Sequence, residues 1–402
     1  MNTRRPISET STPVSLSVAF NQDASCFAVG LNSGFCIFNA ESCELDVKRR
    51  KFCSVSYSPS LSKKAFNGGI GQVQMLERSN YMALIGGGIH PRYKQNILNI
   101  WDEGQRKVAL TIELRTSVLG ARLSKQRIVA ALQTSIHIYG FASSPKKQYV
   151  FETADNPLGL CCLGKKIVAF PGKTPGNVQL VELATGNVTI IPAHSSPLRA
   201  LELSPNGELL ATASEKGTLV RIFSTSNSTK IAELRRGVDA AIIFSMKISP
   251  NNKMLAVTSD KSTLHIFDIP SMEKATHSEA SGEIGNSTAN KWSFLSKLPF
   301  LPRAFSDTYS FASATFNSDD DPDATVDSST AKPPKPIPGI PGGRAPKGIL
   351  GWSNDNAIVV IGAGRDGKWQ RFLLKLDKDG NRVCEHAEWR RYLEGESVDG
   401  DQ

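Results

Sequence analysis

The chain has 402 residues, 40% of them hydrophobic, and a net charge of +9, which allows a large core and favours polyanionic partners such as acidic lipid head groups, nucleic acid or acidic proteins. Its seven cysteines are scattered without Cys-x-x-Cys spacing, which disfavours a disulfide framework and fits a reducing compartment. Residues 1–12 lack the apolar segment of a secretory signal and no apolar run is long enough to span a bilayer, so any membrane contact is expected to be peripheral.

Short strands separated by polar turns recur along the chain after a flexible N-terminus of residues 1–14. The first four units have their clearest strands at 16–38, 81–102, 128–139 and 166–181. The second unit ends in Trp101-Asp102, which is similar to the Trp-Asp dipeptide found in propeller blades. Few segments have a convincing helical period, so the pattern predicts an all-β protein.

Two later units, residues 204–223 and 249–268, are similar to each other, and their strands end at Phe223 and Phe267, 44 positions apart. This is the spacing of propeller blades. A seventh unit follows at 349–377, and the sequence therefore predicts a seven-bladed, WD40-like β-propeller with blades 1–6 in residues 15–271. Residues 378–402 are expected to form a C-terminal tail, and the segment near Ser15 is expected to complete the last blade.

Residues 272–348 interrupt the strand pattern and are rich in Ser, Thr, Asp, Pro and Gly, which predicts a long, largely disordered insertion in blade six with a Pro-rich linker from Lys332. Pro299 and Pro302 exclude one continuous helix. Large apolar side chains nevertheless crowd its first half, which favours a loop lying in a membrane interface; an alternative is a loop that folds its aromatic side chains onto the propeller. The candidates for membrane insertion are Trp292, Phe294, Leu295, Leu298, Phe300, Leu301 and Phe305.

The pair Arg235-Arg236 lies between units five and six. In an extended chain adjacent side chains point to opposite sides, so each guanidinium is expected to face a different flanking repeat. Arginine suits phosphorylated head groups because its planar fork donates two parallel hydrogen bonds and stays charged, and Ser, Thr and His complete such sites. An alternative is a solvated or salt-bridged surface pair. The candidates are His194, Ser214, Thr218, Arg221 and Arg235 for site one, and Arg236, Ser259, Thr263 and His265 for site two.

The core Leu234-Arg235-Arg236-Gly237 between two such repeats resembles the signature of the PROPPINs, the WIPI-type seven-bladed propellers. The usual form has Phe where this chain has Leu234, as in the WIPI-four-like and homologous-with-swollen-vacuole branch, which residues 151–161 and 86–88 also resemble. The residues of both candidate sites match the family's pattern. The resemblance implies a non-enzymatic adaptor of autophagy that binds phosphatidylinositol 3-phosphate and phosphatidylinositol 3,5-bisphosphate through two sites, and a sixth-blade loop that enters the bilayer.

The resemblance also implies a cytoplasmic monomer that is recruited peripherally to preautophagosomal, endosomal or vacuolar membranes. The implied protein partner is the large lipid-transfer protein of autophagy, which would dock on loops of the early blades at Asn21 and Asp23. Polar surface turns that serve solubility alone are the alternative for these two residues. The main alternative for the whole chain is a WD-repeat scaffold for protein partners that never binds lipid.

Several motifs that suggest other chemistry are rejected. Residues 362–367 match G-x-G-x-x-G, but no helix or βαβ unit follows, so a hairpin turn is the better interpretation. Residues 159–166 end in Lys where a P-loop needs Ser or Thr. No zinc-type cluster, metal motif or G-x-S-x-G is present, which predicts no enzyme, cofactor or metal. The aromatic residues gather in one insertion and are not interleaved with basic strands, which disfavours nucleic acid.

Overall fold

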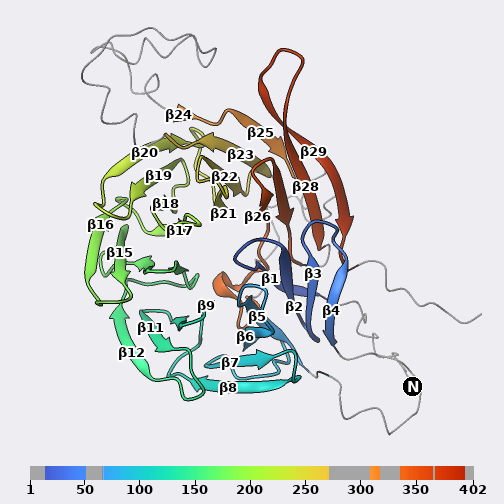
Figure 1. The fold of residues 1–402 in the computed structure, drawn as a ribbon, viewed down its shortest axis with the longest axis vertical. Helices are drawn as coiled ribbons and strands as arrows, with labels where there is room; N and C mark the ends of the chain where they lie inside the picture. The colour runs from blue at the N-terminus through green and yellow to red at the C-terminus, as the bar shows by residue number, and fades with distance from the viewer. Residues whose placement is uncertain are drawn as a thin grey trace, which may run out of the picture.

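The computed structural model describes residues 14–50, 66, 68–270, 308–316, 336–364 and 367–393. Its strands form seven sheets arranged in a ring, each running from a strand near the central axis to a strand at the rim (Figure 1). The predicted seven-bladed β-propeller is therefore confirmed. Among the described residues, no helix is long and apolar enough to cross a bilayer.

The first four blades follow the chain in order. Blade 1 contains β1 (Ser15–Phe20), β2 (Cys26–Leu31), β3 (Gly34–Asn39) and β4 (Leu45–Arg50). Blade 2 contains β5 (Ile70–Met75), β6 (Tyr81–Gly86), β7 (Ile97–Asp102) and β8 (Lys107–Glu113). Blade 3 contains β9 (Gly120–Leu123), β10 (Arg127–Ala131), β11 (Ser135–Gly140) and β12 (Lys147–Glu152). Blade 4 contains β13 (Cys162–Leu163), β14 (Ile167–Pro171), β15 (Asn177–Glu182) and β16 (Val188–Pro192).

The last three blades include the strands around the arginine pair. Blade 5 contains β17 (Leu198–Leu203), β18 (Leu209–Ser214), β19 (Leu219–Ser224) and β20 (Lys230–Arg235), with β24 (Thr308–Tyr309) added in parallel at its edge. Blade 6 contains β21 (Ile243–Ile248), β22 (Met254–Ser259), β23 (Thr263–Asp268) and β25 (Ala312–Thr315). Blade 7 contains β26 (Ile349–Asn354), β27 (Ala357–Ile361), β28 (Lys368–Leu376) and β29 (Arg382–Arg391).

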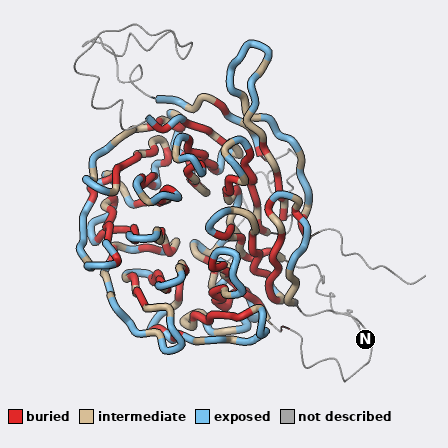
Figure 2. The backbone as a smooth tube through the Cα atoms, in the orientation of Figure 1, coloured by how far each residue is buried: buried red, intermediate tan, exposed pale blue. Residues whose placement is uncertain are grey.

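Burial differs between the strands of one blade, and the rim strand is the most exposed. The second strands are buried along all or nearly all of their length, as β18 is throughout, and they form nearly continuous apolar runs. Rim strands such as β8 are hydrogen-bonded to a neighbouring strand on one edge only and alternate between partly buried and exposed residues. Figure 2 shows this gradient, with red inside the ring and pale blue along the rim. The core is thus a series of apolar layers between blades.

Blade 7 closes the ring onto blade 1. Ser15 and Gly364 exchange backbone hydrogen bonds of 3.1 and 3.0 Å, and the Tyr392 hydroxyl donates to Ser15 Oγ at 3.1 Å. The segment near Ser15 does not complete the last blade as predicted, because β1 is the first strand of blade 1. The predicted end of blade 7 at residue 377 is also too early, since β29 supplies its fourth strand. Polar and charged residues in β29 hide it from a search for apolar strands.

The predicted boundaries of the blade-six insertion, 272–348, are too wide. Strand β25 pairs with β23 and completes blade 6, and Phe316, which follows β25, is buried in the layer between blades 6 and 7. The candidate membrane-inserting residues lie outside the described residues.

The end of the Pro-rich linker packs on the propeller. Residues 336–348, which include the short 3-10 helix η4 (Pro341–Gly343), place Pro338 O 2.8 Å from the amide of Gly88 in blade 2. Gly339 has φ +74°, and a Cβ there would lie 2.6 Å from Gly86 O, so the contact requires glycine. The glycine run 86–88 therefore permits close backbone packing.

Candidate functional site

The two arginines at the end of β20 lie on different faces of blade 5. In the register of β19 and β20, Arg235 lies opposite Leu219, and Glu233 lies opposite Arg221. Opposite residues of paired strands share a face, so these four side chains share one side of the sheet. Leu234 has the other orientation and is buried in the layer between blades 5 and 6. Arg236 is two residues beyond Leu234, so in an extended chain its side chain points to the same side, towards blade 6.

The candidates of site one, apart from Thr218, gather on the face of blade 5 that packs against blade 4. Arg221 donates from Nε to Glu233 Oε2 at 2.7 Å and from Nη1 to the carbonyl of Ala193 at 2.6 Å. His194 Nε2 lies 2.9 Å from Thr212 Oγ1 on β18. Ser214 is buried and, two residues beyond Thr212, shares its face. The carbonyl of Thr218 accepts the amide of Arg236 at 2.9 Å.

Site one keeps its histidine neutral and its carboxylate charged. Burial and the nearby charge of Arg221 lower the pKa of His194 from 6.5 to about 4. Burial acts to raise the pKa of Glu233, but hydrogen bonds and charges from Arg221 and Lys230 hold that pKa below its ordinary value. The face therefore has two arginines, Lys230 and one ionised carboxylate at neutral pH.

The candidates of site two lie between blades 5 and 6. Arg236 is buried and donates from Nε to the carbonyl of Gly217 at 2.8 Å and from Nη2 to the carbonyl of Asp239. His265 Nδ1 lies 3.1 Å from Ser310 Oγ. Ser259 is two residues from Val257, and His265 is two residues from Phe267. Since Val257 and Phe267 pack against blade 5, Ser259 and His265 lie on the face of blade 6 that is turned to blade 5. Two residues before His265 on β23, Thr263 shares this face, and its hydroxyl has no hydrogen-bond partner among the described residues.

Electrostatics at site two is set by burial and by Asp260. Burial lowers the pKa of Arg236, while the charges of Asp260 and Asp239 act to raise it. Burial and the charge of Arg236 lower the pKa of His265. By strand alternation, Arg236 and His265 also belong to the same layer between blades 5 and 6. Within the described part of the chain, the Arg236 guanidinium is bonded to carbonyl groups and to no carboxylate, so its positive charge is not neutralised there by direct pairing.

Sequence reasoning missed the groups that hold these side chains. Glu233 binds Arg221, Thr212 and Ser310 contact the two histidines, and the charge of Asp260 acts on Arg236. Glu233 is two residues from Arg235 in the motif itself, so strand alternation could have assigned it to the same face. Ser310 is far from His265 in the sequence and gives no local signal.

Lowered histidine pKa values predict a loss of stability in acid. The unfolded chain protonates His194 below its ordinary pKa of 6.5, whereas the folded chain does so only near 4. The contribution of His194 to the free energy of unfolding is therefore fully present above pH 6.5 and is lost as the pH falls towards 4. At about 1.36 kcal/mol per pKa unit, this contribution falls by about 2–3 kcal/mol between about pH 7.5 and pH 4.5. Urea unfolding at both pH values should show a smaller loss for His194→Gln than for the wild type. Equal losses of stability in the variant and the wild type would contradict the lowered pKa of His194.

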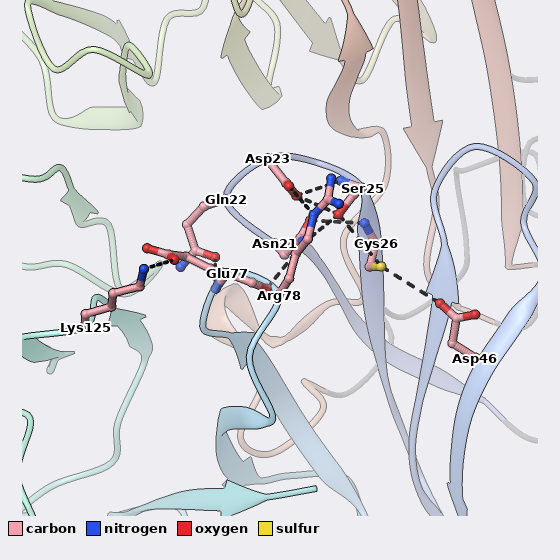
Figure 3. A network of polar contacts seen from close by, with 9 residues as sticks. All are labelled: Asn21, Gln22, Asp23, Ser25, Cys26, Asp46, Glu77, Arg78 and Lys125. Atoms are coloured by element: carbon pink, nitrogen blue, oxygen red, sulfur yellow. Dashed lines mark hydrogen bonds and ion pairs between the residues drawn. The ribbon is translucent and has the colours of Figure 1, made fainter. Parts of the chain in front are cut away.

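The predicted partner-docking residues have different environments (Figure 3). Asn21 is buried: its Nδ2 donates to Ser25 Oγ at 3.0 Å and to Glu77 O at 3.3 Å, and its Oδ1 accepts the Cys26 amide at 3.1 Å. It therefore fixes the β1–β2 turn against blade 2. Asp23 is exposed and pairs with Arg78 Nε at 2.6 Å. Of the two residues, Asp23 is the one whose side chain reaches the surface.

The chain is similar to known proteins over most of its length. The PROPPIN family model matches residues 15–335. SVP1-like protein 2 of Emericella nidulans is 59% identical over 79% of this chain and 99% of its own length, and SVP1-like protein 2 of Neurospora crassa is 41% identical over 98% of this chain and 99% of its own. Among solved structures, Kluyveromyces lactis Hsv2 with its complete loop 6CD has a TM-score of 0.71 at 20% identity, covering 95% of this chain and 100% of that chain. These matches, the seven-bladed ring and the arginine pair between blades 5 and 6 lead to one conclusion: the chain belongs to the PROPPIN family.

Proposed function

We propose that the chain binds phosphatidylinositol 3-phosphate and phosphatidylinositol 3,5-bisphosphate through two head-group sites on either side of blade 5, as a peripheral membrane adaptor of autophagy. Family membership supports the general assignment to phosphoinositide-binding propellers, a binding and adaptor fold. The identity of the two lipids and the presence of two sites go beyond family membership and are part of the proposal. Preautophagosomal, endosomal and vacuolar membranes are the proposed destinations.

One observation carries this proposal: adjacent arginines lie on opposite faces of one blade. Arg235 shares its face with Arg221, whose charge acts on His194, and the charge of Arg236 acts on His265 on the other side. Site one has Arg221, Arg235 and His194 on the blade-4 side, and site two has Arg236 and His265 on the blade-6 side. Phosphate monoesters are recognised by such clusters through charge-assisted hydrogen bonds. Two weak sites on one rigid body also raise the effective concentration of each other, so modest affinities add up to firm attachment.

Residues 292–305 are proposed to insert their aromatic and leucine side chains into the same membrane. Strand β24, which begins shortly after this segment, pairs with β20 at Leu234 and Arg235, so the chain leaves the segment beside the arginine pair. Lipid recognition would then require both a phosphate pattern and an apolar interface. This supports a coincidence detector, in which neither signal alone gives stable binding.

The protein partner is proposed to be the lipid-transfer protein of autophagy, docking on the exposed surface of Asp23 and Arg78. A complex of KlAtg21 with the coiled-coil of AgAtg16, with a TM-score of 0.64 and 18% identity over 94% of this chain and 99% of that chain, shows that a propeller of this shape binds a protein partner. The Asn21 side chain is proposed to contribute indirectly, by holding the turn that presents Asp23.

Glu233 is expected to weaken head-group binding at site one. Its carboxylate occupies the Arg221 Nε donor and adds negative charge beside the site. We expect Glu233→Gln to raise the affinity for soluble inositol 1,3-bisphosphate about threefold, because a partly exposed ion pair of about 0.5–1 kcal/mol no longer competes. Titration calorimetry measures this. Lys173→Gln breaks the exposed pair with Glu152 on another blade and serves as the control, with no change expected.

Flotation with vesicles that each contain one phosphoinositide tests the proposed function. The full chain is expected to float with 3-phosphorylated and 3,5-bisphosphorylated lipid and to remain unbound with phosphatidylinositol. If the chain fails to bind every phosphorylated lipid while it remains folded, the proposal is wrong and a scaffold for protein partners is the remaining function.

A further inference from the structure

Two exposed apolar side chains lie in the loop that directly follows the arginine pair. Val238 is 81% exposed and Ile242 is 46% exposed, in the segment 237–242 that joins blade 5 to blade 6. Single exposed apolar residues are ordinary on protein surfaces. Two in one short loop next to a candidate head-group site are more informative, since clustered exposed apolar groups mark interaction surfaces.

This loop is fixed to both neighbouring blades. Arg236 donates to the carbonyls of Gly217 and Asp239, and the Ala241 amide donates to Lys216 O at 3.2 Å. On the blade-6 side, the Ile242 amide donates to Asp260 Oδ1 at 3.0 Å, and the Asp260 amide donates to Ile242 O at 3.0 Å. The backbone bonds at both ends leave little freedom for the loop to fold its apolar side chains inwards. Val238 is therefore held away from the core.

The charges around the loop indicate which partner it suits. The three adjoining turns, 215–217, 235–239 and 260–261, contain four basic residues and three acidic residues: Arg235, Arg236, Lys216 and Lys261 against Glu215, Asp239 and Asp260. This near balance gives only a weak general attraction to an anionic surface. A specific head-group contact and an apolar contact would have to supply the rest. Apolar side chains flanked by polar and charged groups are typical of segments that lie in a lipid interface.

We propose that Val238 and Ile242 enter the lipid interface as a second, fixed apolar contact beside site two. This inference rests on the proposed function and adds an element separate from residues 292–305. Because the loop is bonded to both blades, its insertion would fix the tilt of the propeller on the membrane. It would also couple the head-group contact of Arg236 to the depth of insertion, since the same guanidinium holds the loop.

The experiment compares two variants that remove the same kinds of side chain. Val238→Ser/Ile242→Ser changes the loop, and Val188→Ser/Ile190→Ser changes an exposed pair on rim strand β16 of blade 4, with exposures of 45% and 60%. Binding is measured to phosphatidylcholine vesicles containing phosphatidylinositol 3-phosphate and, separately, to soluble inositol 1,3-bisphosphate. We expect the loop variant to lose about tenfold in vesicle affinity and nothing in soluble binding. The rim variant should match the wild type.

A gain-of-function variant supports the same test. Ala240→Leu adds apolar surface at another exposed position of the loop and should raise vesicle affinity severalfold while soluble binding is unchanged. Unchanged vesicle affinity in the loop variant overturns the inference and leaves the proposed function intact. Equal losses in vesicle and soluble binding also overturn it, because the loop would then act only through Arg236. If wild-type protein binds neither probe, the proposed function itself fails.

Discussion

Replacing Arg235 and Arg236 together with threonine is expected to abolish vesicle flotation while the propeller stays folded. Each charge-assisted hydrogen bond contributes about 1.5–3 kcal/mol, so losing one at each site lowers binding by at least about a hundredfold. Arg236 also clamps loop 237–242 through two carbonyl groups, which makes a small loss of stability part of the expected result. Flotation on phosphatidylinositol 3-phosphate vesicles and thermal unfolding measure the two effects.

Two matched variants separate geometry from charge. Lys146→Thr/Lys147→Thr removes an adjacent, exposed basic pair from blade 3 and should leave flotation nearly unchanged. Arg235→Lys/Arg236→Lys keeps the charge and removes the planar fork, so it should bind less than the wild type and more than the threonine variant. If the threonine variant floats like the wild type, the arginine pair is not the head-group site.

Replacing Trp369 with alanine is expected to lower the free energy of unfolding by about 3–5 kcal/mol, the range for a large buried aromatic side chain. Trp369 is 0% exposed in the apolar layer between blades 7 and 1, and its Nε1 donates to the carbonyl of Ala40 at 2.8 Å. The substitution leaves a cavity and an unpaired carbonyl where the ring closes. Urea denaturation measures the change.

Trp389→Ala serves as the control for that experiment. Trp389 is 54% exposed on β29, where Lys368 Nζ lies 5.9 Å from the centroid of its ring. Its removal should cost less than about 1 kcal/mol, the size of an exposed cation–π contact. Similar losses for the two tryptophan variants would show that closure between blades 7 and 1 does not dominate stability.

The fold could be predicted because blade formation is local in sequence. Most neighbouring strands within a blade are joined by short turns, so apolar spacing and turn residues identify them, as for β18 and β19. The arginine pair was also visible, because it lies between two similar repeats and alternation sends its side chains apart. Strand β29 was missed because it is a rim strand, paired with β28 alone, and contains many charged residues in place of an apolar run.

The sequence by itself determined the seven-bladed architecture, the place of Arg235 and Arg236 between blades 5 and 6, and the residue types around them. Only the tertiary structure decided that Ser15 bonds to Gly364, that Asn21 is buried beneath the turn presenting Asp23, and that the Pro-rich segment packs on Gly88. It also decided that Arg221 pairs with Glu233 and that Arg236 holds loop 237–242. The physical reason is range: strand period and turn chemistry act over a few residues, whereas ring closure and side-chain pairing depend on how separate strands and blades meet in space.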